Sequence, residues 1–137
     1  MKKITVAVCL DDEEGMIFNN RRQSRDRVLI AELLDSTEGK IYSHPYSLLL
    51  FGDNERIVVS DDPLGECTDG AIAFIEQLPI KPYIDSVGSF IVYRWNRLYP
   101  AEKYFDIDLE KEGFKLETKK EFVGSSHDNI EKGIYRR

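Results

Sequence analysis

The sequence has 137 residues, of which 42% are hydrophobic and 32% are charged; this balance is typical of a globular protein and excludes a disordered chain. Its 19 basic and 25 acidic side chains leave a formal net charge of −6, so the surface repels phosphate backbones and nucleic acid is not an expected partner. No apolar run approaches the ~18 residues that cross a membrane, so we expect no membrane contact. We therefore predict one cytoplasmic domain over residues 1–137.

Side chains that commonly bind metals are few and scattered. The two cysteines, Cys9 and Cys67, provide neither a disulfide framework nor a metal site. The two histidines, His44 and His127, lie far apart and lack the short spacing of metal ligands. No glycine-rich phosphate-binding motif occurs either. We predict no metal and no cofactor for this chain.

The first third of the chain predicts a strand, a loop and a helix. The run ITVAVCL at 4–10 is almost wholly apolar, which is typical of a strand covered on both faces. The acidic segment at 11–20 predicts a loop, and we interpret its DDEEG portion as a solvated turn. Ser24 is the expected N-cap of the next helix, with Asp26 in the first turn, where carboxylates are favoured. Apolar residues continue this helix to about Leu34.

The middle of the chain alternates short apolar runs with turn residues. Pro45 suits the first turn of a short helix, and Gly52 suits its C-terminal side. The segment 79–85 holds two prolines and cannot form a long helix. The predicted strands of this region are KIYS (40–43), RIVVS (56–60), AIAFIE (71–76), SFIVYRW (89–95) and YFDIDL (104–109).

The C-terminal tail has a different pattern. Apolar and polar residues alternate over 114–122 and again over 130–137, on both sides of a polar segment. Period-two alternation on two flanks predicts an antiparallel hairpin, with residues 123–129 as its exposed loop. Together with the alternating strands and helices before it, this tail predicts an α/β fold with a single mixed sheet, few short helices and a C-terminal hairpin.

The hairpin loop contains GSSHD, the residue types of a nucleophile, a base and an orienting carboxylate. Members of a catalytic triad usually come from separate segments, because neighbours in a chain point in different directions. Glycine, serine and aspartate are also common turn residues. We therefore interpret the stretch as an ordinary loop, and expect alanine at Ser125, Ser126 or His127 to change stability by at most about 0.5 kcal/mol.

The order of these segments resembles that of a dihydrofolate reductase, in a shortened and divergent form. Asp26 lies within one residue of the register of that family's pocket carboxylate, so the resemblance implies a pocket near Asp26. The tail is its most specific part. The segments that carry the resemblance are ITVAVCLDDEEGM (4–16), SRDRVLIAELL (24–34), ERIVVSDDP (55–63), FIVYRWN with YFDIDL (90–109) and FKLETKKEF with IYRR (114–137).

Departures from the family's pattern affect the predicted activity. In the family a glycine pair leads into a helix N-terminus that holds the cofactor diphosphate, because glycine allows close backbone approach. Here Glu76 and Gln77 stand in those positions, and Pro79 shortens the helix beyond. The turn SHPYS at 43–47 lacks the arginine and threonine that bind a further phosphate in the family. We predict that NADPH does not bind usefully.

Two functions from different classes follow. The first is a non-catalytic domain that binds an unidentified small molecule or protein and keeps a remnant pocket near Asp26. The alternative is an oxidoreductase that uses a reduced nicotinamide or pterin in a rearranged site, where Asp26 would be the catalytic pocket carboxylate. Short proteins similar to this one are also labelled ribonuclease Z. That enzyme resembles a metallo-β-lactamase and needs an HxHxDH run, which is absent here.

Overall fold

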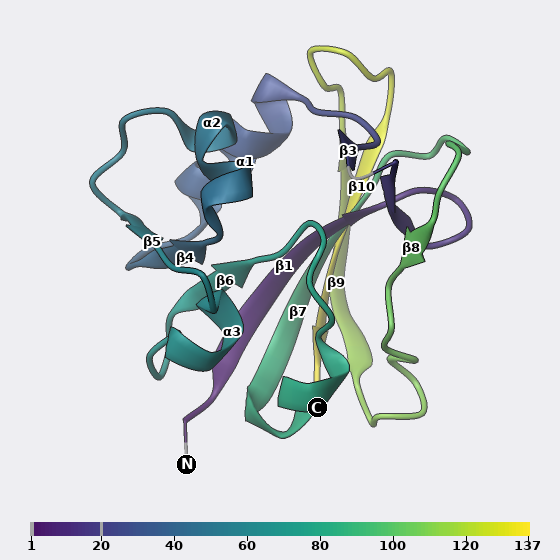
Figure 1. Cartoon of the computed structure of the whole chain (residues 1–137). Coiled ribbons are helices and arrows are strands. Elements are labelled where there is room, and N and C mark those ends of the chain that lie inside the picture. The colour runs from purple at the N-terminus through teal and green to yellow at the C-terminus, as the bar shows by residue number, and fades with distance from the viewer. Residues whose placement is uncertain (1, 20) are drawn as a thin grey trace.

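The protein was analysed as a computed structural model that describes residues 2–19 and 21–137 (Figure 1). Its strands are β1 (Ile4–Leu10), β2 (Gly15–Phe18), β3 (Arg21–Arg22), β4 (Ile41–Ser43), β5 (Ile57–Val59), β6 (Ile72–Phe74), β7 (Val87–Arg94), β8 (Lys103–Tyr104), β9 (Lys115–Phe122) and β10 (Ile130–Arg136). Its helices are α1 (Arg27–Ser36), α2 (Leu48–Phe51) and α3 (Pro63–Glu66), with 3-10 turns η1 (Pro45–Ser47) and η2 (Lys81–Ser86).

The main sheet has seven strands in the order β5-β4-β6-β1-β7-β10-β9. The strands from β5 to β7 run parallel to their neighbours, whereas β10 and β9 extend the sheet antiparallel. Parallel neighbours need crossover connections, and the short helices lie in those connections (Figure 1). The predicted mixed α/β sheet with few short helices and a C-terminal hairpin is confirmed.

Strand β1 lies inside the sheet and is covered on both faces, as its continuous apolar run predicts. Ile4, Val6, Val8 and Leu10 belong to one core, which also holds Leu64 of α3. Ala7 belongs to the opposite core, together with residues of α1 and α2. Helices α1 and α2 therefore cover one face and α3 covers the other (Figure 1).

A second, small antiparallel sheet joins β3, β2 and β8. The prediction of a loop over 11–20 is therefore wrong for Gly15–Phe18, because β2 pairs with β8, whose distant sequence no local pattern reveals. The DDEEG turn is not fully solvated either, since Asp11 is buried and its carboxylate accepts hydrogen bonds from backbone N–H groups, including that of Gly15.

The predicted strand at 104–109 is also wrong beyond its first residue. Only Lys103–Tyr104 form β8. The carboxylate of Asp106 accepts hydrogen bonds from the backbone N–H groups of Ile80 and Lys81. An aspartate that binds backbone in this way favours a turn over continued strand pairing.

The start of α1 also differs from the prediction. Asp26, not Ser24, is the N-cap: its backbone is extended, and its side chain accepts hydrogen bonds from the N–H groups of Val28 and Leu29. Both residue types are good N-caps, so the sequence alone did not discriminate between them. The hydroxyl of Ser24 lies 3.0 Å from His127 Nε2 instead. Among the described residues, none of the helices has the length and apolar character that a membrane crossing requires.

Candidate functional site

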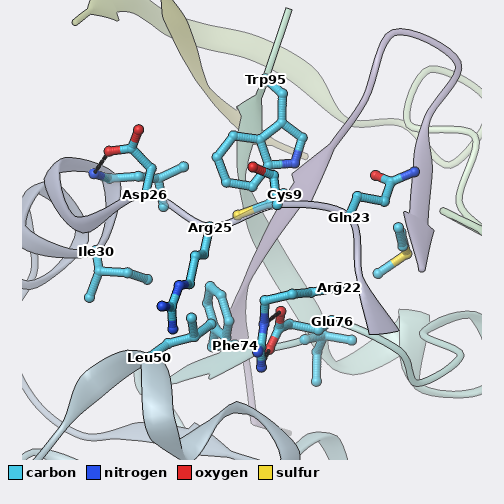
Figure 2. Close-up of a pocket in the computed structure, with 14 residues that line it drawn as sticks. Cys9, Arg22, Gln23, Arg25, Asp26, Ile30, Leu50, Phe74, Glu76 and Trp95 are labelled. Atoms are coloured by element: carbon cyan, nitrogen blue, oxygen red, sulfur yellow. Dashed lines mark hydrogen bonds and ion pairs between the residues drawn. The ribbon is translucent and has the colours of Figure 1, made fainter. Parts of the chain in front are cut away.

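A small pocket lies at the carboxyl ends of β1 and β6, which is where ligands commonly bind in open α/β sheets. Its cavity volume is about 20 Å³, room for a single water molecule. Figure 2 shows side chains converging on it from the two strands, the start of α1 and α2. Its lining residues are Cys9, Met16, Arg22, Gln23, Ser24, Arg25, Asp26, Leu29, Ile30, Leu50, Phe74, Ile75, Glu76 and Trp95.

A larger groove adjoins this pocket between α1, α2 and the hairpin loop. Its volume is about 540 Å³, and it shares Arg25, Asp26, Ile30 and Leu50 with the small pocket. Its lining is partly apolar and includes Leu49, which is 84% exposed. The other lining residues are Arg27, Phe51, Gly52, Ser125 and Ser126.

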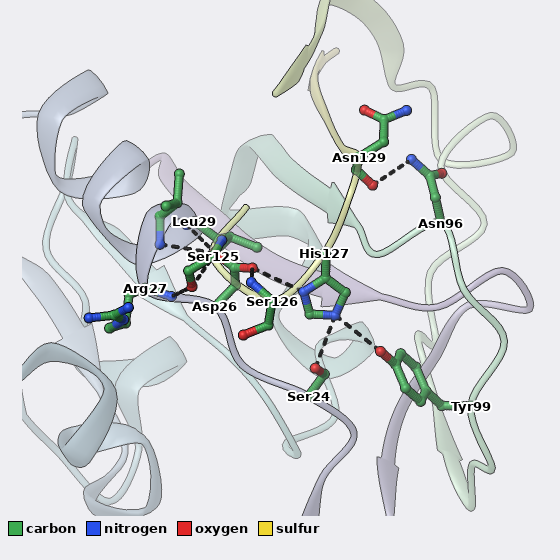
Figure 3. Close-up of polar contacts among 11 residues, drawn as sticks. Ser24, Asp26, Arg27, Leu29, Asn96, Tyr99, Ser125, Ser126, His127 and Asn129 are labelled. Atoms are coloured by element: carbon green, nitrogen blue, oxygen red, sulfur yellow. Dashed lines mark hydrogen bonds and ion pairs between the residues drawn. The ribbon is translucent and has the colours of Figure 1, made fainter. Parts of the chain in front are cut away.

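Asp26 borders both cavities, yet its carboxylate is fully enclosed. Oδ1 accepts hydrogen bonds from the N–H groups of Val28, Leu29 and Ser125 and from the Ser125 hydroxyl. Oδ2 accepts from Ser126 N–H at 2.8 Å and lies 3.0 Å from His127 Nδ1 (Figure 3). A carboxylate has about four lone-pair sites. These donors therefore leave no free acceptor for a ligand.

The protonation of Asp26 follows from these contacts. Burial alone would raise the pKa of Asp26, but hydrogen bonds from His127 and from backbone N–H groups hold the pKa well below its usual range. The carboxylate is thus ionised, and its charge is distributed over donors from α1 and from the hairpin loop. It tethers these two elements, which are about 100 residues apart in sequence.

His127 is the centre of the cluster and is only 4% exposed. Its Nδ1 faces Asp26, and its Nε2 lies 3.0 Å from Ser24 Oγ and 3.0 Å from Tyr99 Oη. The ring stacks on Trp95, with centroids 4.5 Å apart and an interplanar angle of 25°. Figure 3 shows the imidazole held between the loop, the start of α1 and Tyr99.

The interpretation of residues 123–129 as an ordinary exposed loop is therefore only partly right. The hairpin and its loop are confirmed, but the loop folds inward around Asp26. The serines and His127 do not form a relay with Asp128, which is exposed. The histidine instead meets Ser24 and Asp26, and these long-range partners had no signal in the local sequence.

On the opposite wall of the pocket, Glu76 is bound by a bidentate ion pair. Arg22 Nε lies 2.9 Å from Glu76 Oε2, and Arg22 Nη2 lies 3.0 Å from Oε1. Ser47 donates to Oε1 at 2.6 Å, and the guanidinium lies over the ring of Tyr46. Arg22 thus largely neutralises the charge of Glu76, which stands where the resemblance implies a glycine, but the pair occupies this side of the pocket (Figure 2).

Arg25 extends from the segment before α1 towards Leu50 and Phe74 (Figure 2). In the described part of the chain its guanidinium has neither a carboxylate partner nor a hydrogen-bond acceptor, and the same holds for that of Arg27. Within that same part, no three His, Cys, Asp or Glu side chains converge to hold a metal ion.

The fold is that of a dihydrofolate reductase. A structure of dihydrofolate reductase from Enterococcus faecalis, complexed with NADP(H) and RAB-propyl, matches 98% of this chain and 96% of its own with a TM-score of 0.69. The sequences are 7% identical, so the likeness concerns the fold alone. No protein-family model matches the chain, and no curated protein matches it by sequence. The predicted dihydrofolate-reductase-like fold is confirmed.

Proposed function

We propose that this protein binds a small molecule that combines an apolar body with an anionic group, in the groove between α1, α2 and the hairpin loop. The observation that carries the proposal is the pairing of two uncommitted arginines, Arg25 and Arg27, with an exposed apolar surface in one concave site. Ligand sites of this kind are mostly apolar, with few polar groups that fix orientation.

The arginines favour an anion because each guanidinium offers a planar set of donors that matches a carboxylate or a phosphate. Both side chains stand at the N-terminal end of α1, whose helix dipole adds to the positive potential there. Asp26 offsets part of that potential, but all its acceptor sites are engaged in hydrogen bonds within the protein.

The apolar part of the ligand would cover the exposed side chain of Leu49 and the neighbouring Leu50, Phe51 and Ile30. A large apolar side chain that is 84% exposed beside a cavity is a favourable contact for a ligand. Burying it removes apolar surface from water, which contributes roughly 25 cal/mol per Å².

The proposed binding can be tested by calorimetry with 4-phenylbutyrate and with 4-phenylbutyramide, its uncharged analogue. We expect the carboxylate to bind at least about tenfold more tightly, since a hydrogen bond to a charged group contributes ~1.5–3 kcal/mol. Joint replacement of Arg25 and Arg27 by glutamine should remove this preference. Arg97→Gln, an exposed position outside the groove, should leave it unchanged. Equal binding of the two compounds, or binding of neither, would contradict the proposal.

Hydride transfer from a nicotinamide is the second candidate, because the fold matches that of an enzyme whose structure holds NADP(H). Two features of this chain oppose it. The carboxylate of Asp26 is saturated with hydrogen bonds, and the Arg22–Glu76 pair occupies one wall of the pocket. We expect NADPH to bind with a Kd weaker than ~100 µM, or roughly 5.5 kcal/mol. A saturable low-micromolar calorimetric signal would instead favour the reductase.

A further inference from the structure

Three side chains beside the pocket stand in a line. Ser24 Oγ lies 3.0 Å from His127 Nε2, and His127 Nδ1 lies 3.0 Å from Asp26 Oδ2 (Figure 3). Ser24 and Asp26 precede α1, whereas His127 comes from the hairpin loop. The fold therefore assembles, from separate segments, the arrangement that the contiguous GSSHD stretch cannot form by itself.

We propose that Ser24 is a nucleophile towards small carboxylic esters, with His127 as its general base and Asp26 as the residue that positions the imidazole. This activity goes beyond the ligand binding proposed above and does not depend on it. The hydroxyl of an isolated serine is a weak nucleophile, and a base within about 2.6–3.2 Å activates it.

The contacts around His127 favour this role. Asp26 is an ionised acceptor, so the hydrogen that faces it belongs to Nδ1, and neutral imidazole then has its lone pair on Nε2, towards Ser24. Backbone N–H groups of Ser125 and Ser126 hold the carboxylate in place, and Trp95 fixes the plane of the ring. The base is thus oriented, and its ring is buried.

Ser24 itself is more accessible than its base. It is half-buried and lines the small pocket, whereas His127 is buried. Because that pocket holds about one water molecule, the ester would have to reach Ser24 from the adjoining groove, which shares Arg25 and Asp26 with it. Arg25 lines the same pocket with a cationic side chain. Cys9 is the other potential nucleophile on this wall, but burial, followed by the charges of Glu76 and Asp26, raises the pKa of its thiol far above its usual range and keeps it protonated.

The reaction would proceed by acyl transfer. Ser24 Oγ attacks the carbonyl carbon of the ester while its proton moves to His127 Nε2. The bond between carbonyl carbon and leaving oxygen then breaks, and the alcohol leaves with that proton, which gives an ester on Ser24. Water attacks this ester, transfers a proton to Nε2, and Ser24 Oγ recovers it as the carboxylic acid departs. Water is the only co-reactant.

The hydroxyl of Tyr99 makes it possible to distinguish an activated serine from a purely structural hydrogen-bond network. This hydroxyl also lies 3.0 Å from His127 Nε2. Neutral imidazole has one acceptor lone pair at this atom, so Tyr99 and Ser24 compete for it. Removing the tyrosine hydroxyl should therefore make Ser24 more reactive, whereas a purely structural network would show no gain in reactivity.

The test uses a fluorophosphonate probe, which labels activated serines: a Ser24 Oγ–P bond forms, the P–F bond breaks, and fluoride and a proton leave. Intact mass and peptide mapping should show one label per chain, on Ser24. The folded protein should react at least about 100-fold faster than the same chain in denaturant, because general-base catalysis contributes ~10²–10⁴-fold. Ser24→Ala should abolish labelling, and Ser86→Ala, a serine of η2 outside the pocket, should not affect it.

Further variants test the relay. Tyr99→Phe should increase the labelling rate, and His127→Gln should reduce it to the rate of the unfolded chain. If His127→Gln does not fold, the Tyr99→Phe variant and the comparison with denatured wild type still test the proposed role of Ser24. Absence of labelling on folded wild type, labelling at another residue, or an unchanged or lower rate in folded Tyr99→Phe would overturn the proposal. The carboxylate preference of the groove is measured separately through Arg25 and Arg27, so either proposal can fail alone.

Discussion

Two polar clusters face each other across the small pocket, and they differ in how their carboxylates are stabilised. The Asp26 cluster comprises Ser24, Asp26, Tyr99 and Ser125–His127, and its carboxylate has no exposed surface. The Glu76 cluster comprises Arg22, Tyr46, Ser47 and Glu76 and contains a bidentate ion pair, in which the arginine side chain is 21% exposed and the glutamate 9%.

The two carboxylates also differ in the groups that donate hydrogen bonds to them. Asp26 mainly binds backbone N–H groups and a buried ring, so it determines where α1 begins and how the hairpin loop folds. Glu76 binds the hydroxyl of Ser47 and the flexible side chain of Arg22, which can still contact water. A buried charge left without partners is costly, whereas a partly exposed one is rehydrated. Damage to the Asp26 cluster should therefore cost more than damage to the Glu76 cluster.

The largest effect should come from Asp26→Ala. This change leaves donors of α1, Ser125, Ser126 and His127 without an acceptor, so we expect a loss of about 3–5 kcal/mol, as for removal of one partner of a buried pair. Asp26→Asn keeps the shape and one acceptor oxygen and should lose less. Urea unfolding followed by circular dichroism measures both. A loss below about 1 kcal/mol in Asp26→Ala would show that water replaces the carboxylate.

Acid is a milder way to disturb the same carboxylate. The pKa of Asp26 is lower in the folded protein than its value of about 3.9 in the unfolded chain. Between these values the unfolded chain binds more protons, so stability is fully present above about pH 4 and is lost as the pH falls. We expect the melting temperature to drop below pH 4, and to drop less in Asp26→Asn.

Glu32 contributes to acid sensitivity in the same direction. Burial alone would raise the pKa of Glu32, but hydrogen bonds from Lys120, Lys132 and Tyr93 lower it. Asp26→Asn should therefore remove only part of the acid sensitivity. An unchanged pH profile in that variant would contradict the assignment of a lowered pKa to Asp26.

His127→Ala should cost about 2–3 kcal/mol, because it removes a buried ring stacked on Trp95 and leaves polar partners unpaired. This replaces the expectation of at most about 0.5 kcal/mol, which was based on an exposed loop. Ser125→Ala should cost roughly 1 kcal/mol, since its hydroxyl contacts Asp26 and the N–H of Arg27. Ser126→Ala is the matched control and should stay within about 0.5 kcal/mol. Equal effects of all three changes would contradict this ranking.

Glu76→Gln should have a smaller effect than Asp26→Ala, about 1–2 kcal/mol, because Arg22 retains access to water. The same unfolding experiment measures it. Glu110→Gln, at an exposed glutamate, should change stability by no more than about 0.5 kcal/mol. A loss in Glu76→Gln as large as that in Asp26→Ala would mean that the two clusters are equally enclosed.

The sequence by itself determined the elements with a clear local signal. The apolar run of β1, the alternation in β9 and β10, and the position of Gly52 after α2, where φ is +63°, were all readable from neighbouring residues. Burial on one or both faces of β1 and β10 imposes a period on their side chains, and a period can be recognised without knowledge of distant segments. The order of these elements was enough to indicate the fold.

Only the tertiary structure decided the site. Asp26 could be read as a pocket carboxylate and GSSHD as a plain loop, because neither segment reveals that the two meet. Strand β2 was missed and β8 was predicted only at Tyr104 for the same reason, since each strand is short and is stabilised by pairing with residues far along the chain. Hydrogen bonds between side chains about 100 residues apart depend on where the sheet places its loops, and no local pattern encodes that placement.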